Sequence, residues 1–288
     1  MSRLYDALRR IEKEKRQPGA GAPEPGKAVE LLSNIMAPPV KTTDGPSATT
    51  NVGKASRLVA LTDPHSLGAE KFRALVARLE SLRQRQKREL KSLQITSSVI
   101  NEGKSLVAAN LAITLVKHFG YRVLLVEGDL HRPTLTTLLG LSNLEGINQW
   151  WRRREENKET DPYIYKLDDM PLCFLSAGST CDQPSQILQS ARFAESFVRL
   201  VDDFDWVVVD STPMAPIVDA NLWSRLVDGT LLVVREGVAS VKALRMGVGG
   251  LDNPKWLGIV LNEASEFDRV NYADQYYGVK TNEPRTRE

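Results

Sequence analysis

From Ser92 onward, short apolar runs alternate with amphipathic stretches. The runs are rich in Val, Ile and Leu, as are strands that are buried on both faces of a sheet. Their alternation with helical segments indicates right-handed βαβ units in a parallel sheet. The expected strands lie in SLQITSS, YRVLLVEGD, PLCFLSAGS, DWVVVDST, GTLLVVREG and WLGIVLNEA. The pattern therefore predicts an α/β fold with helices on both faces of the sheet. The polar stretch between Asn148 and Asp169 predicts a helix end and then a surface loop.

Three further segments precede the first expected strand. Apolar residues spaced by four and then three positions predict a short amphipathic helix in residues 1–17. In residues 18–57, eleven of forty positions are Gly or Pro, which predicts a disordered linker. A second helical pattern starts near Ser66 and carries an apolar face formed by Phe72, Leu75, Leu79 and Leu82.

Composition excludes several classes of protein. The apolar runs are shorter than the about 20 residues that a membrane-spanning helix needs, and no apolar signal region follows the charged start, so we expect a cytoplasmic protein. Cys173 and Cys181 have no partners at ligand spacing, so no zinc site is predicted. Residues 58–288 carry 28 Lys and Arg against 30 Asp and Glu, which argues against a nucleic-acid-binding face.

The segment after the first expected strand carries the strongest chemical signal. It reads SSVINEGKSLVAANLA and opens a helix that should end at Gly120. Gly103, Lys104 and Ser105 match the end of a phosphate-loop pattern, although Ser98 replaces its first glycine. In such loops, backbone N–H groups and the helix N-terminus hold phosphate, the Lys reaches the β- and γ-phosphates, and the hydroxyl binds Mg²⁺. The segment therefore predicts a nucleotide site.

Carboxylates close two later strands. Glu127 and Asp129 follow VLLV, and Asp210 ends the strand in FDWVVVDSTP. Ligands of open α/β sheets bind where the carboxyl ends of the strands meet. Mg²⁺ prefers oxygen ligands, and one or two carboxylates together with phosphates suffice for it. We therefore expect Ser105, Asp129 and Asp210 to hold Mg²⁺.

These segments, together with PSQILQSARF, resemble the bacterial tyrosine kinases of capsule and exopolysaccharide biosynthesis over about residues 66–278. The resemblance implies a P-loop NTPase-like fold, with a Walker A motif at residues 98–105, a Walker A′ motif at residues 127–129 and a Walker B carboxylate at Asp210. It also implies ATP-dependent autophosphorylation on tyrosine. The expected division is a helix in 1–17, a linker in 18–57, a kinase domain in 58–265 and a flexible, tyrosine-containing tail in 266–288.

The resemblance also implies roles for single residues. Lys104, Asp129 and Glu127 are the candidate catalytic residues, and we favour Asp129 as the group that accepts the tyrosine proton. Asn262 is expected near the adenine. The expected ATP-binding residues are Ser98, Asn101, Glu102, Gly103, Lys104, Ser105, Leu106 and Asn262.

Assembly is implied in the same way. EKFRALV is similar to a self-association motif at Glu70 and Arg73, so a homo-oligomer is expected. Family members join a membrane protein that regulates polysaccharide chain length, which would hold the chain at the inner face of the plasma membrane. The expected autophosphorylation sites are Tyr272, Tyr276 and Tyr277.

Departures from the family pattern leave alternatives open. Ile100-Asn101 stands where the family has Pro-Gly, Glu127 replaces Asp, His131 replaces Arg, and Val76 replaces the last Arg of the self-association motif. A nucleotide-binding regulator without kinase activity, a pseudokinase, is therefore one alternative. A partition or cell-division ATPase is the other, although such proteins carry a signature Lys where this chain has Val99.

Overall fold

The computed structural model of the chain describes residues 46–53, 56–85, 89–155, 162–167, 172–179, 183–214, 218–249 and 255–264. The helix expected in residues 1–17, most of the expected linker and the tail in residues 266–288 lie outside these ranges.

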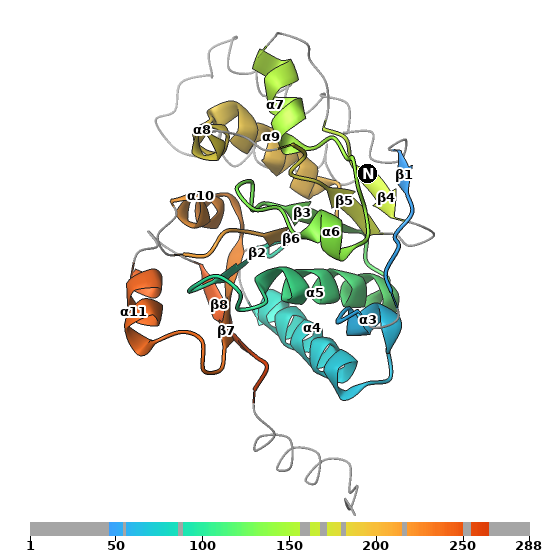
Figure 1. The fold of residues 1–288 in the computed structure, drawn as a ribbon, viewed down its shortest axis with the longest axis vertical. Coiled ribbons are helices and arrows are strands. Elements are labelled where there is room, and N and C mark those ends of the chain that lie inside the picture. The colour runs from blue at the N-terminus through green and yellow to red at the C-terminus, as the bar shows by residue number, and fades with distance from the viewer. Residues whose placement is uncertain are drawn as a thin grey trace, which may run out of the picture. The chain divides into compact units, whose positions relative to one another are not determined.

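The described residues form an eight-stranded sheet in the order β1-β4-β5-β3-β6-β2-β7-β8 (Figure 1). The paired neighbours are parallel except for β4 and β5. All six strands that the sequence predicts are present. The strands are β1 (Ser47–Ala48), β2 (Ser92–Ser97), β3 (Val123–Glu127), β4 (Tyr165–Leu167), β5 (Leu172–Leu175), β6 (Trp206–Asp210), β7 (Gly229–Arg235) and β8 (Trp256–Asn262).

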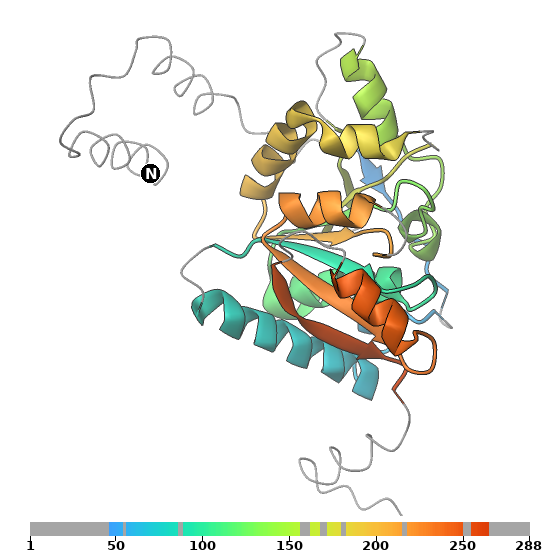
Figure 2. The same cartoon turned by 90° about the vertical axis from the view of Figure 1, so that its left-hand side faces the viewer.

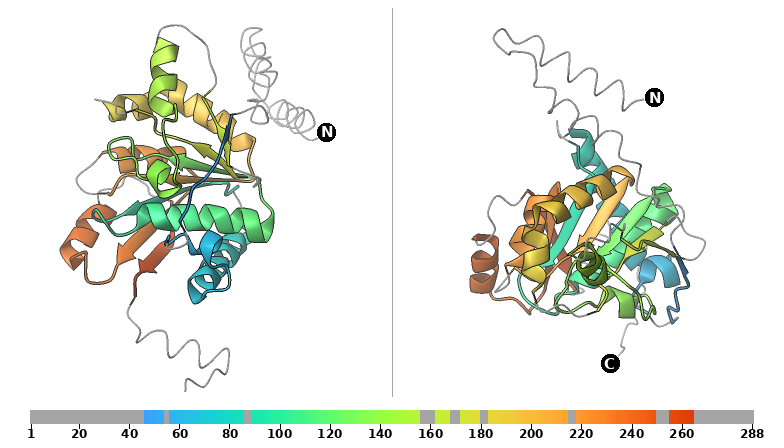
Figure 3. Two further views of the ribbon diagram at one scale, coloured as in Figure 1. Left: turned by 45° about the vertical axis from the view of Figure 1, so that its right-hand side comes forward. Right: turned by 90° about the horizontal axis from the view of Figure 1, so that it is seen from above.

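Helices cover both faces of the sheet, as the sequence predicts (Figures 2 and 3). The helices α3, α4 and α5 lie on one face, and α8, α9, α10 and α11 lie on the other. Their bounds are α3 (Val59–Thr62), α4 (Leu67–Arg85), α5 (Lys104–Phe119), α6 (Leu135–Leu138), α7 (Ile147–Glu155), α8 (Pro184–Gln189), α9 (Ala191–Asp202), α10 (Asp219–Leu226) and α11 (Val241–Gly249). None of these described helices combines the length and the apolar character that crossing a membrane requires.

The central strands have no exposed face. Every residue of β2, β3 and β6 is buried. The sequences of β3 and β6 are accordingly almost continuously apolar, whereas β2 also buries polar residues such as Gln94, whose Nε2 donates to Ser211 Oγ at 2.9 Å. On one face, the strand residues Leu125 and Val208 share a core cluster with Leu111 of α5. On the other face, Trp223 of α10 meets Phe197 of α9 edge to face, with ring centroids 5.4 Å apart. Apolar side chains of helices therefore pack against both faces of the sheet.

Two strands lie where the sequence predicted none. β1 falls inside the expected linker, pairs with β4, and is followed by Asn51, whose N–H donates to the Leu139 carbonyl at 3.3 Å. β4 falls inside the expected surface loop, with Tyr165 and Leu167 buried and Lys166 exposed. This alternation is only three residues long, so it was too short to identify from its period.

Candidate functional site

The phosphate loop connects β2 to α5 and keeps a left-handed turn without its usual glycine. Asn101 stands where the family has Gly and adopts a φ of 63°. Asn tolerates this region better than other non-glycine residues because its short side chain hydrogen-bonds locally. Gly103, with a φ of 88°, precedes the first residue of α5, and a Cβ there would lie 2.2 Å from Asn262 Nδ2. Gly103 is therefore required both for its φ and for the approach of Asn262.

Glu102 is a buried carboxylate that ties this loop together. Its Oε2 accepts hydrogen bonds from Ser98 Oγ and the Val99 N–H, both at 2.8 Å. Its Oε1 accepts the Arg235 N–H from the end of β7 at 3.2 Å, and its carbonyl oxygen accepts Asn262 Nδ2 from the end of β8 at 2.9 Å. The sequence placed Glu102 among the ATP-binding residues but gave no signal for this joining role, because its partners lie far apart along the chain.

Lys104 lies between two strand-end carboxylates. Its Nζ is 3.0 Å from Asp129 Oδ2 and 3.9 Å from Asp210 Oδ1. Burial opposes the charged form, but Asp210 and Asp129 outweigh that effect, so the pKa of Lys104 is raised above its ordinary value. Lys104 therefore carries its positive charge at neutral pH, beside the loop that should hold phosphate.

Asp210 is fully buried, and among the described residues neither of its carboxylate oxygens has a hydrogen-bond partner. Burial raises the pKa of Asp210 to about 7 against the opposing effect of Lys104. A buried strand-end carboxylate beside this loop fits a cation ligand, because a bound metal or its water would add partners to the contact with Lys104. Ser105 Oγ is 2.8 Å from Thr134 Oγ1 and supplies a hydroxyl at the start of α5.

These residues fit Mg²⁺ better than a metal held only by protein. The described part of the chain contains no group of three or more His, Cys, Asp or Glu side chains that could hold a metal ion. Mg²⁺ keeps several waters and needs only one or two carboxylates beside phosphate oxygens. Ser105, Asp129 and Asp210 are the residues that would hold it.

Glu127 differs from Asp129 in its surroundings. Its carboxylate is buried and accepts four hydrogen bonds, from the Thr136 N–H and Oγ1 at 2.9 and 2.7 Å and from Ser176 Oγ and the Ala177 N–H at 3.1 Å each. Asp129 accepts the Arg132 N–H at 3.0 Å and faces Lys104. Glu127 therefore joins β3 to α6 and to the end of β5, whereas Asp129 faces the phosphate loop.

His131, which replaces a family arginine, is also held by an acid. Its Nε2 lies 2.9 Å from Asp219 Oδ2, and the other oxygen of this buried carboxylate accepts Ser185 Oγ at 2.6 Å. The only sequence signal for the pair of His131 and Asp219 was that His131 departs from the family pattern.

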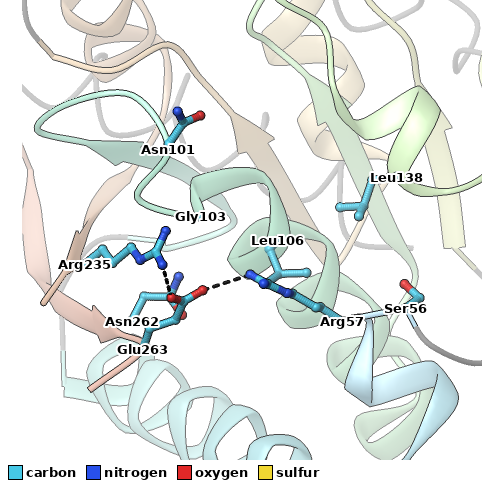
Figure 4. Close-up of a pocket in the computed structure, with 9 residues that line it drawn as sticks. All are labelled: Ser56, Arg57, Asn101, Gly103, Leu106, Leu138, Arg235, Asn262 and Glu263. Atoms are coloured by element: carbon cyan, nitrogen blue, oxygen red, sulfur yellow. Dashed lines mark hydrogen bonds and ion pairs between the residues drawn. The ribbon is translucent and has the colours of Figure 1, made fainter. Parts of the chain in front are cut away.

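A cavity of about 360 Å³ adjoins the phosphate loop (Figure 4). Asn101 and Gly103 of the loop line it, and so does Leu106 in the first turn of α5. Asn262, expected near the adenine, lies on its wall. Its other lining residues are Ser56, Arg57, Leu138, Arg235 and Glu263.

The expected self-association residues lie on α4. Arg73 Nε donates to Glu70 Oε2 at 2.8 Å, and Arg73 Nη1 donates to the Pro64 carbonyl at 2.8 Å. Val76, which replaces the last Arg of the motif, is buried in the core cluster that also contains Leu111 of α5. Self-association stays a prediction. Tyr272, Tyr276 and Tyr277 lie outside the described residues.

Comparisons with known proteins place this site in a family. No protein-family model matches the chain. CapB of Staphylococcus aureus, named as a tyrosine-protein kinase, is 31% identical over 221 residues, which cover 75% of this chain and 92% of CapB. The tyrosine-protein kinase YwqD of Bacillus subtilis is 28% identical over 227 residues, covering 78% of this chain and 92% of YwqD.

A larger relative and a solved structure are also similar to this chain. The succinoglycan biosynthesis transport protein ExoP of Rhizobium meliloti is 32% identical over 227 residues, which are 77% of this chain and 28% of ExoP. The crystal structure of the chimerical protein CapA2B2 superimposes with a TM-score of 0.65 at 27% identity, covering 76% of this chain and 95% of that one. Because the likeness to CapB spans nearly all of CapB, and because the fold superimposes on that of CapA2B2, the chain belongs to the family of bacterial tyrosine-protein kinases of capsule and exopolysaccharide biosynthesis.

Proposed function

We propose that the chain is an ATP-dependent tyrosine kinase that phosphorylates its own tail and acts in capsule or exopolysaccharide biosynthesis. The observation that carries the proposal is the position of Lys104 between the buried carboxylates of Asp129 and Asp210, at the N-terminus of α5. Family membership makes phosphoryl transfer to tyrosine the best-supported chemistry for this arrangement, and it sets aside the partition-ATPase alternative.

Catalysis of this kind depends on positioning and on neutralising charge. Lys104 would neutralise oxygens of the terminal phosphates, and backbone N–H groups at the start of α5 would hold them in place. Ser105, Asp129 and Asp210 would hold Mg²⁺, which supplies further positive charge when it is bound.

The acceptor tyrosine must lose its proton as the new bond forms, since a free tyrosine hydroxyl has a pKa near ~10. We assign the proton acceptor to Asp129 in preference to Glu127, because four donors already occupy the carboxylate of Glu127. An Asp129→Asn variant that still binds Mg²⁺ but forms no phosphotyrosine would support this role over a purely metal-binding one.

Incubation with Mg-ATP followed by anti-phosphotyrosine detection tests the proposed function, with Lys104→Met as the inactive control. Peptide mass spectrometry should then find phosphate on Tyr272, Tyr276 and Tyr277, and a triple Tyr→Phe variant should lose it. Nucleotide binding without phosphotyrosine in the wild-type chain would instead establish the pseudokinase alternative, which the altered residues Asn101, Glu127 and His131 favour.

We also propose a partner and a location. In ExoP and in Wzc of Salmonella typhi, the region similar to this chain makes up 28% and 30% of a longer protein. The proposed partner is a membrane protein that regulates polysaccharide chain length, which would hold this chain at the inner face of the plasma membrane. We propose as well that the chain forms homo-oligomers through contacts of Glu70 and Arg73. Loss of oligomers in an Arg73→Ala variant, measured by light scattering, tests that last point.

A further inference from the structure

The carboxylate of Glu263 lies between two arginines along the cavity beside the phosphate loop (Figure 4). Its Oε1 is 2.9 Å from Arg57 Nη1, and its Oε2 pairs with Arg235 Nη2. Arg57 comes just before α3, whereas Glu263 directly follows β8. This Glu263 bridge, formed by Arg57, Glu263 and Arg235, therefore connects the two ends of the described domain across the cavity.

Hydrogen bonds hold the backbones of Arg57 and Arg235 in place, and Glu263 has an unusual backbone conformation. The Arg57 carbonyl accepts Asn110 Nδ2 of α5 at 3.2 Å. The Arg235 N–H donates to Glu102 of the phosphate loop at 3.2 Å. Glu263 has a φ of 51°, a left-handed conformation that residues other than Gly, Asn and Asp rarely adopt. Such conformations cluster at functional sites because the surrounding structure must hold them.

The ion pairs alone contribute little energy. The side chains of Arg57, Arg235 and Glu263 are 74%, 37% and 36% exposed, and pairs with this exposure are screened by water and salt. The bridge instead fixes the positions of the guanidinium groups of Arg57 and Arg235 at the cavity. Two guanidinium groups against one carboxylate also leave this region positively charged.

The cavity is placed to take the nucleoside part of a nucleotide. Asn101 and Gly103 belong both to the phosphate loop and to the cavity wall, so a ligand with its phosphates on the loop would extend into the cavity. Its volume of about 360 Å³ falls in the range of small-molecule sites. Guanidinium groups stack on flat aromatic rings, which suits a purine base.

We propose that Glu263 is a positioning residue for the nucleoside part of ATP, because it holds Arg57 and Arg235 where their guanidinium groups face the base. The inference rests on the proposed function, which places the phosphates on the loop of Lys104. It also makes nucleotide binding depend on residues at both ends of the domain.

The test compares Mg-ADP with Mg-pyrophosphate, which has the same phosphates but no nucleoside, by calorimetry on the full chain. At low salt, Glu263→Gln should weaken ADP binding about three- to tenfold, consistent with the loss of exposed charge contacts and stacking, and should leave pyrophosphate binding unchanged. The loss should shrink as ionic strength rises. Glu145→Gln is the matched control, because Glu145 is also a half-exposed partner of an arginine, Arg153, but does not line the cavity.

Lys104→Met keeps the two proposals apart, since it should weaken binding of both ligands. Arg57→Gln and Arg235→Gln should each weaken ADP binding, and combining either with Glu263→Gln should add less than the sum of the single losses. Unchanged ADP binding in Glu263→Gln at low salt, equal losses for both ligands, or fully additive losses would overturn the inference. A wild-type chain that binds neither ligand would overturn the proposed function, and the inference with it.

Discussion

Glu127 and Asp210 are register partners at the carboxyl ends of β3 and β6, and both are buried. Their carboxylates differ in the number of hydrogen bonds that they accept. Glu127 accepts four hydrogen bonds, whereas Asp210 accepts none from the described residues. A satisfied buried carboxylate stabilises the fold, whereas an unsatisfied one is costly until a cation or a proton reaches it. We therefore expect Glu127 to stabilise the fold and Asp210 to contribute to ligand binding.

Asp210→Asn should abolish most of the Mg²⁺ dependence of ADP binding. Loss of a metal-site carboxylate should weaken Mg²⁺ binding by at least about tenfold. Calorimetry of ADP with Mg²⁺ and with EDTA measures the effect. An Asp210→Asn protein that still gains affinity from Mg²⁺ as the wild type does would show that the metal ligand lies elsewhere.

The difference in Tm between Asp210→Asn and the wild type should depend on pH. The folded-state pKa of Asp210, about 7, lies above its ordinary value of 3.8, so the folded state holds the proton more tightly than the unfolded state does. In the absence of Mg²⁺, the stability that this group contributes is therefore present below about pH 4 and is lost as pH rises toward 7. Thermal melts with EDTA should show Asp210→Asn gaining Tm over the wild type as pH rises from about 4 to about 7. A constant difference in Tm across that range would contradict the raised pKa.

Glu127→Gln and Asp129→Asn should separate stability from activity. Glu127→Gln turns one acceptor into an amide donor that faces N–H and O–H donors, which should cost about 1–3 kcal/mol of unfolding free energy. Asp129→Asn keeps the shape of a side chain that faces Lys104 and should reduce phosphotyrosine formation far more than stability. Denaturant unfolding and anti-phosphotyrosine detection on both variants make the comparison. The reverse pattern would assign catalysis to Glu127.

Glu102→Ala should loosen the phosphate loop. It leaves the Val99 and Arg235 N–H groups without their acceptor, so we expect a loss of about 1–3 kcal/mol in unfolding free energy and weaker ADP binding. Glu195→Ala, which removes an exposed acid from α9, is the control. Equal ADP affinity in both variants would show that the loop does not need Glu102 to bind phosphate.

Truncation should locate the start of the folded domain. Removal of residues 1–45 should leave Tm nearly unchanged, whereas removal of residues 1–57 should lower it. The longer deletion removes β1 and Arg57, whose carbonyl accepts Asn110 Nδ2. Thermal melts of both truncated chains make this comparison, and equal Tm values would show that β1 adds no stability.

Local sequence was enough to predict the six longer strands, the phosphate loop and the strand-end acids. Buried parallel strands are often near-continuous apolar runs, and Gly103-Lys104-Ser105 between a strand and an amphipathic helix is typical of an anion-binding loop. Parallel strands also bring their carboxyl ends to one edge, so Asp129 and Asp210 could be placed near Lys104 before any distance was known.

Only the tertiary structure distinguishes the surroundings of the two acids. Glu127 and Asp210 both end apolar strands, and only their neighbours, Thr136 and Ser176 for one and Lys104 for the other, distinguish them. The two short strands were missed because their pairing partners, and not their own residues, stabilise them.

The Glu263 bridge is the clearest example of a contact that the sequence could not predict. Arg57 and Glu263 are 206 residues apart in sequence, and no period or motif relates them. Their contact exists because β8 ends beside the phosphate loop and because Asn110 of α5 holds the Arg57 carbonyl at that edge. Sequence by itself determined the elements and the chemistry available at the sheet edge. The folded chain decided which charges meet there, because burial and pairing between distant segments depend on three-dimensional proximity.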